Sequence, residues 1–67
     1  MDKFELDVLI RRIRFTCAAL AEDGLEMICC PENPKILAHE MACKADDIAA
    51  MAHRIRTAAK NGDFDGS

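Results

Sequence analysis

The second half of the chain carries apolar residues at the three- and four-residue spacings of a coiled-coil seam. They are Leu37, Met41, Ile48, Met51 and Ile55, which fall on one stripe of an α-helix. Asn33 and Pro34 form a helix start, because Asn caps free backbone N–H groups and Pro lacks the donor that would go unpaired there. Asn61 and Gly62 form a helix stop. The pattern therefore predicts one long helix over residues 34–60.

A row of alanines lies beside this stripe, and its small side chains would let another helix approach closely. The row consists of Ala38, Ala42, Ala45, Ala49, Ala52 and Ala59. The two stripes together make the helix apolar over nearly half its circumference. A single short partner helix is therefore not expected to cover it.

One charged residue, Lys44, falls in the middle of the apolar stripe. A polar residue at such a position can fix the register or the oligomeric state of a helix pair. Its long stem also allows the ammonium group to reach the edge of the stripe, or to meet an acid on a partner. The sequence leaves these three roles open.

The first half of the chain predicts a helix that starts at residue 3. Asp2 and Glu5 have the spacing of a capping box, in which each side chain accepts a hydrogen bond from the other residue's backbone N–H group. The main apolar stripe consists of Leu6, Ile10, Ile13, Cys17 and Leu20, with Leu9 on its flank. This stripe is expected to face the second helix.

The sequence offers two ends for the first helix. Asp23 and Gly24 favour an end at residue 23, whereas the apolar spacing continues to Met27 and favours an end near Cys29. Residues before proline avoid the α region, so the turn is expected at 30–33.

We therefore predict a single all-α domain over residues 1–67, an antiparallel two-helix hairpin. Residues 61–67 are expected to form a frayed tail. A chain of 67 residues that is 51% hydrophobic is not expected to be disordered, yet two helices bury little core alone. Oligomerisation is the usual remedy, so we expect a homodimer that forms a four-helix bundle.

The charges of the two helices complement each other if the hairpin folds about residue 28 or 29. The acidic start of the first helix would then meet the basic end of the second, and a basic cluster would lie near two acids. The residues concerned are Asp2, Glu5 and Asp7 with Arg54, Arg56 and Lys60, and Arg11, Arg12 and Arg14 with Asp46 and Asp47. Such matching disfavours other registers.

Net charge and hydropathy narrow the function classes. The net charge of −3 argues against a general nucleic-acid binder. No apolar run reaches membrane-spanning length, and charged residues occupy the N-terminal positions where a signal peptide would be apolar. We expect a cytoplasmic protein without membrane contact, in which Cys17, Cys29, Cys30 and Cys43 are free, half-buried thiols.

The first helix has a second apolar face, roughly opposite its main stripe. Phe4, Val8 and Phe15 lie together there, with Arg11 and Arg12 beside them. Exposed aromatic patches usually mark an interface. The face is expected either to pack in the homodimer or to serve as the docking site for another, larger protein.

The arginines and the cysteines suggest two other kinds of site. Arg11, Arg12 and Arg14 could contact the phosphates of RNA, although acids elsewhere in the chain favour a solvated, ion-paired face.

A metal site could be built from Cys29, Cys30, His39 and Cys43, because His39 and Cys43 are four residues apart on one helix. Adjacent Cys29 and Cys30 do not form a Cys-x-x-Cys knuckle, and Cys43 lies far from the turn, so no metal is expected.

The sequence contains no nucleophile with a base at a spacing that indicates catalysis, and no glycine-rich phosphate loop. We therefore predict no enzymatic activity and no cofactor. The leading hypothesis is a small interaction module that binds and modulates, or inhibits, a larger protein, as phage- or plasmid-type regulators do. The alternative is an RNA-binding regulator of the small dimeric four-helix-bundle type, and a third class is a small metal sensor.

Overall fold

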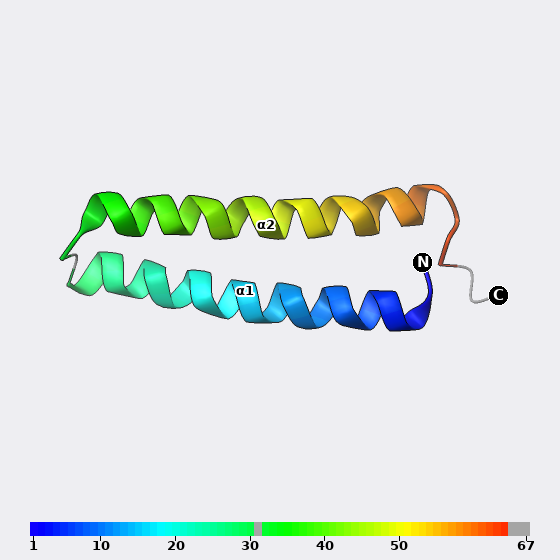
Figure 1. Ribbon diagram of the computed structural model, residues 1–67, viewed down its shortest axis with the longest axis horizontal. Helices are drawn as coiled ribbons and strands as arrows, with labels where there is room; N and C mark the ends of the chain where they lie inside the picture. The colour runs from blue at the N-terminus through cyan, green and yellow to red at the C-terminus, as the bar shows by residue number, and fades with distance from the viewer. Residues whose placement is uncertain (31, 65–67) are drawn as a thin grey trace.

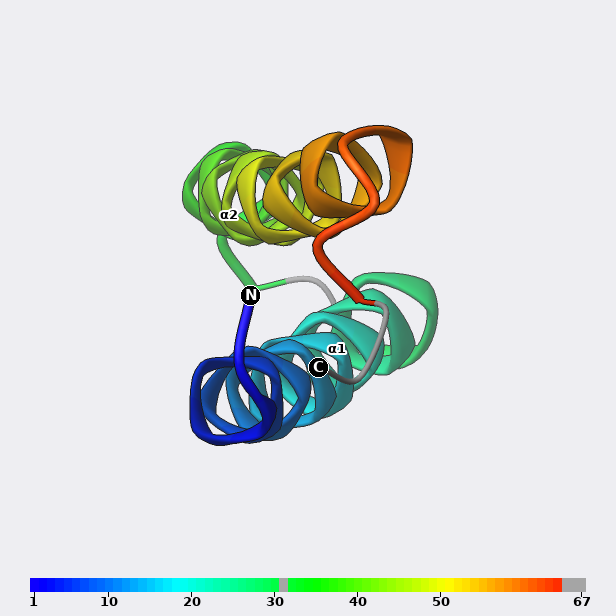
Figure 2. The ribbon, with the colours of Figure 1, turned by 90° about the vertical axis from the view of Figure 1, so that its right-hand side faces the viewer.

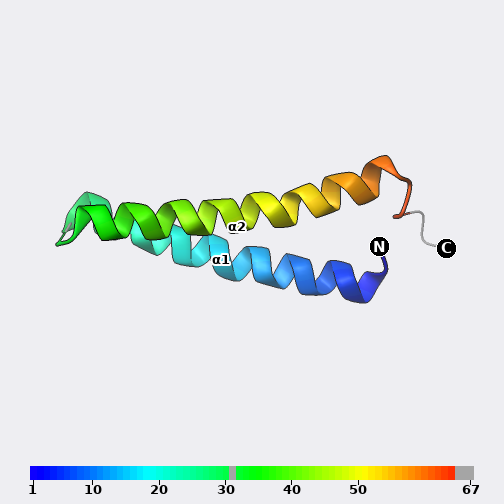
Figure 3. The ribbon, with the colours of Figure 1, turned by 45° about the horizontal axis from the view of Figure 1, so that its top comes forward.

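The computed structural model of the chain describes residues 1–30 and 32–64. Its two helices, α1 (Lys3–Cys29) and α2 (Pro34–Lys60), run antiparallel and side by side (Figure 1). Together they form a rod of 50 × 16 × 13 Å. The end-on view shows that the helices cross, and the oblique view shows the same crossing (Figures 2 and 3). The predicted all-α antiparallel hairpin is confirmed.

The start of α1 is capped by a side chain. The Asp2 carboxylate accepts a hydrogen bond from the backbone N–H group of Glu5 at 2.7 Å. The Glu5 carboxylate accepts from Arg54 of α2 at 3.3 Å instead of completing a capping box. α1 then continues through Asp23 and Gly24 to Cys29, which is the longer of its two expected extents.

The end of α2 is closed by a Schellman motif. Gly62 adopts a φ of 72°, its N–H group donates to the carbonyl of Ala59, and the N–H group of Asp63 donates to that of Ala58. The Met1 ammonium group donates to the Asp63 carbonyl at 3.1 Å and ties the two ends of the chain together. Within the tail expected from residue 61, Asn61, Gly62 and Asp63 thus take part in backbone hydrogen bonds, and residues 65–67 lie outside the described part.

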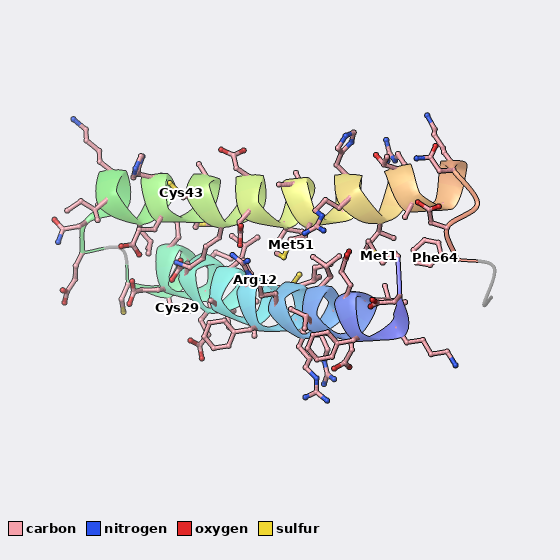
Figure 4. All side chains as sticks on the ribbon, turned by 45° about the vertical axis from the view of Figure 1, so that its right-hand side comes forward. Met1, Arg12, Cys29, Cys43, Met51 and Phe64 are labelled. Carbon is pink, nitrogen blue, oxygen red and sulfur yellow. The ribbon has the colours of Figure 1, made fainter. Side chains whose placement is uncertain are left out.

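The core is a single seam in which seven positions of each helix alternate at spacings of three and four. In α1 they are Leu6, Leu9, Ile13, Thr16, Leu20, Asp23 and Met27; in α2 they are Leu37, Met41, Lys44, Ile48, Met51, Ile55 and Ala58. Among the described residues only Leu9, Leu37, Met51 and Ala58 are buried. Figure 4 shows Met51 pointing from α2 toward α1.

The stripe expected for the first helix agrees with the seam at Leu6, Ile13 and Leu20 but differs from it at Ile10 and Cys17. Leu9, placed on its flank, is only 4% exposed, whereas Ile10 is 43% exposed and Cys17 is also exposed. The reason is that two polar residues, Thr16 and Asp23, occupy seam positions. A count of apolar residues alone passes over them. It therefore selects Ile10 and Cys17 in place of Leu9 and Thr16, the residues directly before them.

Gly24, inside α1, and Gly62, just after α2, predict opposite responses to alanine. A Cβ added at Gly24, in the interior of α1, would lie 3.7 Å from the Met41 Cε atom, which is ordinary contact. Gly24→Ala should therefore raise the free energy of unfolding by about 0.5–1 kcal/mol. Gly62→Ala should lower it by about 1 kcal/mol, because φ there is left-handed. Urea denaturation followed by circular dichroism measures both, and a loss of stability in the Gly24 variant would contradict the packing described.

Candidate interaction site

The most exposed aromatic side chains of α1 lie on one outer stripe. Phe4 and Phe15 are 78% and 77% exposed, and Val8 between them is also exposed. The four- and seven-residue spacings place all three on the same side of the helix. Eleven residues separate the two rings, so their backbone positions lie about 16 Å apart along the helix axis. We call Phe4, Val8 and Phe15 the Phe4/Phe15 edge.

Phe15 borders a shallow groove between the two helices. The groove is lined by Phe15, Thr16 and Ala19 of α1 and by Cys43, Lys44 and Asp47 of α2. A second hollow is lined by Arg11, Arg14 and Phe15. The aromatic ring thus lies between an apolar hollow on one side and arginines on the other, which is the pairing of side chains found at binding hot spots.

Two of the three arginines of α1 form ion pairs. The Arg11 Nε atom lies 2.9 Å from a carboxylate oxygen of Asp7, one turn earlier, and Arg12 lies 3.6 Å from Asp47 of α2 (Figure 4). Arg14 forms no ion pair within residues 1–30 and 32–64. Pairs this exposed contribute less than about 1 kcal/mol each.

The charge matching expected between the helices is present in part. Glu5 meets Arg54, and Arg12 meets Asp47, as the complementary ends predict. Arg11 pairs within its own helix instead. The helices are connected between Cys29 and Pro34, so the fold point lies later than residue 28 or 29 and the register shifts accordingly.

A second polar contact lies inside the seam. The Lys44 ammonium group donates to the Asp23 carboxylate at 2.6 Å, and these side chains are only 27% and 19% exposed. Glu40 lies 3.7 Å from the same ammonium group. Lys44 therefore meets an acid on the other helix of its own chain.

Asp23 was missed because Asp followed by Gly is typical of a helix end. A strict seven-residue count finds it, since Leu9, Thr16 and Asp23 are evenly spaced along the seam.

The four residues considered for a metal site do not come together. The Cys43 Sγ atom lies 3.6 Å from the His39 Nε2 atom, but Cys29 lies on the other helix (Figure 4). Within the described residues, no group of three or more His, Cys, Asp or Glu side chains could hold a metal ion. All four cysteines are exposed free thiols rather than half-buried ones.

Neither helix, over the described residues, combines the length and apolarity needed to span a bilayer. Comparison of the chain with models of protein families, with curated proteins and with solved structures finds no match.

The seam contact predicts an alkaline loss of stability. The pKa of Lys44 lies above its usual 10.5, first because Asp23 hydrogen-bonds the ammonium form, and also because the charges of Asp23 and Glu40 attract it; partial burial opposes the shift. A group whose pKa is raised by folding stabilises the folded state at every pH below its pKa in the unfolded chain. This stabilisation is lost as the pH rises through the pKa that the group has in the folded chain. The stabilisation from this contact should therefore disappear above pH 10.5.

The measurement is the urea midpoint from about pH 8 to about pH 12 for the unmodified chain and for Asp23→Asn. The difference between them should shrink as Lys44 loses its proton. Asp7→Asn is the control, because its partner Arg11 stays charged throughout this range, so its difference should stay constant. Parallel curves for the unmodified chain and Asp23→Asn would contradict the assigned contact.

Proposed function

We propose that this chain is a non-enzymatic interaction module that binds a larger protein through the Phe4/Phe15 edge and thereby modulates or inhibits it. The observation that carries the proposal is the pair of aromatic rings that are more than three-quarters exposed on one stripe of α1. Exposing such a patch to water is unfavourable, and a partner surface that covers it gains the apolar burial.

The spacing of the edge indicates the shape of the partner surface. Phe4, Val8 and Phe15 follow the pattern of an amphipathic helix that lies in an apolar groove, with anchors one and three turns apart. Arg14, which forms no ion pair within the described residues, borders the same hollow as Phe15. The partner we propose is a protein with an apolar groove for the two rings and carboxylates along its rim.

A binding rod of this size would act by occupying a surface that its partner needs. We therefore propose a regulatory role of the kind that small phage- or plasmid-encoded proteins have. RNA binding by Arg11, Arg12 and Arg14 is the competing function. It is less favoured because Asp7 and Asp47 already neutralise two of these arginines and because the net charge of the chain is −3.

The test begins with a photo-crosslinking amino acid, benzoylphenylalanine, placed at Phe15 in one sample and at Leu25 in a control. Leu25 is also exposed, at 62%, and lies on the same helix but away from the edge. Adducts formed in an extract of the source cells identify the partner. An RNase-sensitive adduct at Phe15, in place of a protein adduct, would replace the proposed function with the RNA-binding one.

The deciding measurement is then the affinity of variants of this chain for the purified partner. Phe15→Asp should weaken binding by about 30-fold or more, the loss typical of a hot-spot residue. Leu25→Asp should change it by less than about twofold. Isothermal titration calorimetry measures both, and circular dichroism checks that the variants stay helical. Equal affinities for the two variants would contradict docking through the Phe4/Phe15 edge.

A further inference from the structure

The opposite side of the hairpin carries a second exposed surface, in which small and apolar side chains predominate. Relative to Leu9 and Met51 at the centre of the seam, its residues lie roughly 80–140° around each helix. We call this surface the alanine edge. It consists of Ile10, Cys17, Ala21 and Ile28 of α1 and Ala38, Ala45, Ala52 and Ala59 of α2, all exposed.

Contacts on both sides of the seam show that the two helices share this surface. The ion pairs Glu5–Arg54 and Arg12–Asp47 join the helices on the side of the Phe4/Phe15 edge. On the other side the Met41 Cε atom lies over Gly24, at 3.7 Å from the place that a Cβ on this residue would take. The alanine edge continues outward from Gly24 and Met41, so α1 and α2 form one continuous apolar face there.

The two edges differ in charge. The Phe4/Phe15 edge is crossed by ion pairs, whereas none of the eight residues of the alanine edge carries a charge. Three charged residues fall within the same angular range: Lys3 at the start of α1, and Arg14 and Arg56 at its outer limit of about 140°. An uncharged centre with a charged rim is the composition of a stable protein–protein interface.

The chain as a whole exposes more surface than a compact monomer of its mass, and the excess is large enough for a second copy to cover. The accessible surface is 5244 Å², against about 4,200 Å² for a compact monomer of this mass. The excess of about 1,000 Å² is close to the roughly 800 Å² that each partner buries in a standard interface. The radius of gyration, 15.2 Å, likewise exceeds the roughly 11 Å of a compact chain of this length.

We propose that a second copy of this chain docks on the alanine edge to form a four-helix bundle. A two-fold dimer presents the same surface from both copies, and this surface is apolar on both sides. Its small side chains allow helix axes to approach to about 8 Å. The homodimer thus forms on the side opposite the aromatic stripe and leaves the Phe4/Phe15 edge open. This assignment does not rest on the proposed partner protein.

Thiol reactivity tests the proposal on the unaltered chain. Cys17 lies on the alanine edge near the middle of α1, and Cys43 lies on the other side of the hairpin; both are exposed in the single chain. Under reducing conditions, N-ethylmaleimide should modify Cys17 about tenfold more slowly than Cys43 once nine-tenths of the chains are dimeric. Dilution should abolish the difference. Mass spectrometry of the digested protein measures both rates, and equal rates at every concentration would overturn the proposal.

Light scattering on a sizing column provides the second measurement. The chain should elute with twice its mass of 7.4 kDa. Ala45→Glu should halve that mass, whereas the matched variant Phe15→Glu should leave it unchanged. A monomer at about 1 mM, or a monomer from Phe15→Glu together with a dimer from Ala45→Glu, would overturn the proposal. If circular dichroism shows that Ala45→Glu does not fold, the Cys17 and Cys43 rates of the unaltered chain decide.

Discussion

The packing of α1 against α2 along one seam is the interaction on which the rest of this structure depends. Each helix can offer only one narrow stripe to the other, so four described side chains are buried and the remaining apolar residues stay on the outside. A chain of this length reaches a small fraction of the apolar burial available to a larger domain. The surfaces left uncovered are therefore a direct result of folding as a rod.

Those surfaces are unequal, and the difference has a physical cause. On one side of the seam, long charged side chains reach across to the other helix, as Arg12 does to Asp47, and large rings stand outside them. On the other side, alanines and a few branched residues leave a smoother face, with charged residues only at its margin. Close helix packing requires the second kind of surface, while selective recognition of a different protein uses the first.

Most of the fold follows from the sequence, and the seam does so only in part. The spacing from Leu37 to Ile55, the Asn33-Pro34 start and the Gly62 stop define α2, and the structure has the same limits. In α1, however, Thr16 and Asp23 belong to the seam although neither is apolar, so the hydrophobic pattern identified the wrong flank. Asp23 also resembled a helix end, because Asp followed by Gly is typical of one. Its long-range pairing favours a different role, as a residue of the seam. Its role depends on Lys44, which is distant in the sequence.

The exposed aromatic stripe is visible from the sequence because helical periodicity alone separates Phe4 and Phe15 from Leu6 and Leu20. What the sequence does not give is the relation of that stripe to α2. Only the cross-helix contacts reveal that the rings and the alanine row lie on opposite sides of the rod.

The contact between Lys44 and Asp23 also bears on how the chain finds its fold. A seven-residue repeat is nearly the same after sliding by one period, so a hairpin of this kind risks kinetic traps in which the helices pair out of step. Sliding α1 by seven residues would replace Asp23 with Thr16 opposite Lys44 and leave the ammonium group without its carboxylate. The correct pairing is therefore lower in free energy than the pairings shifted by seven residues. The chain is then less often trapped in the shifted pairings while it folds.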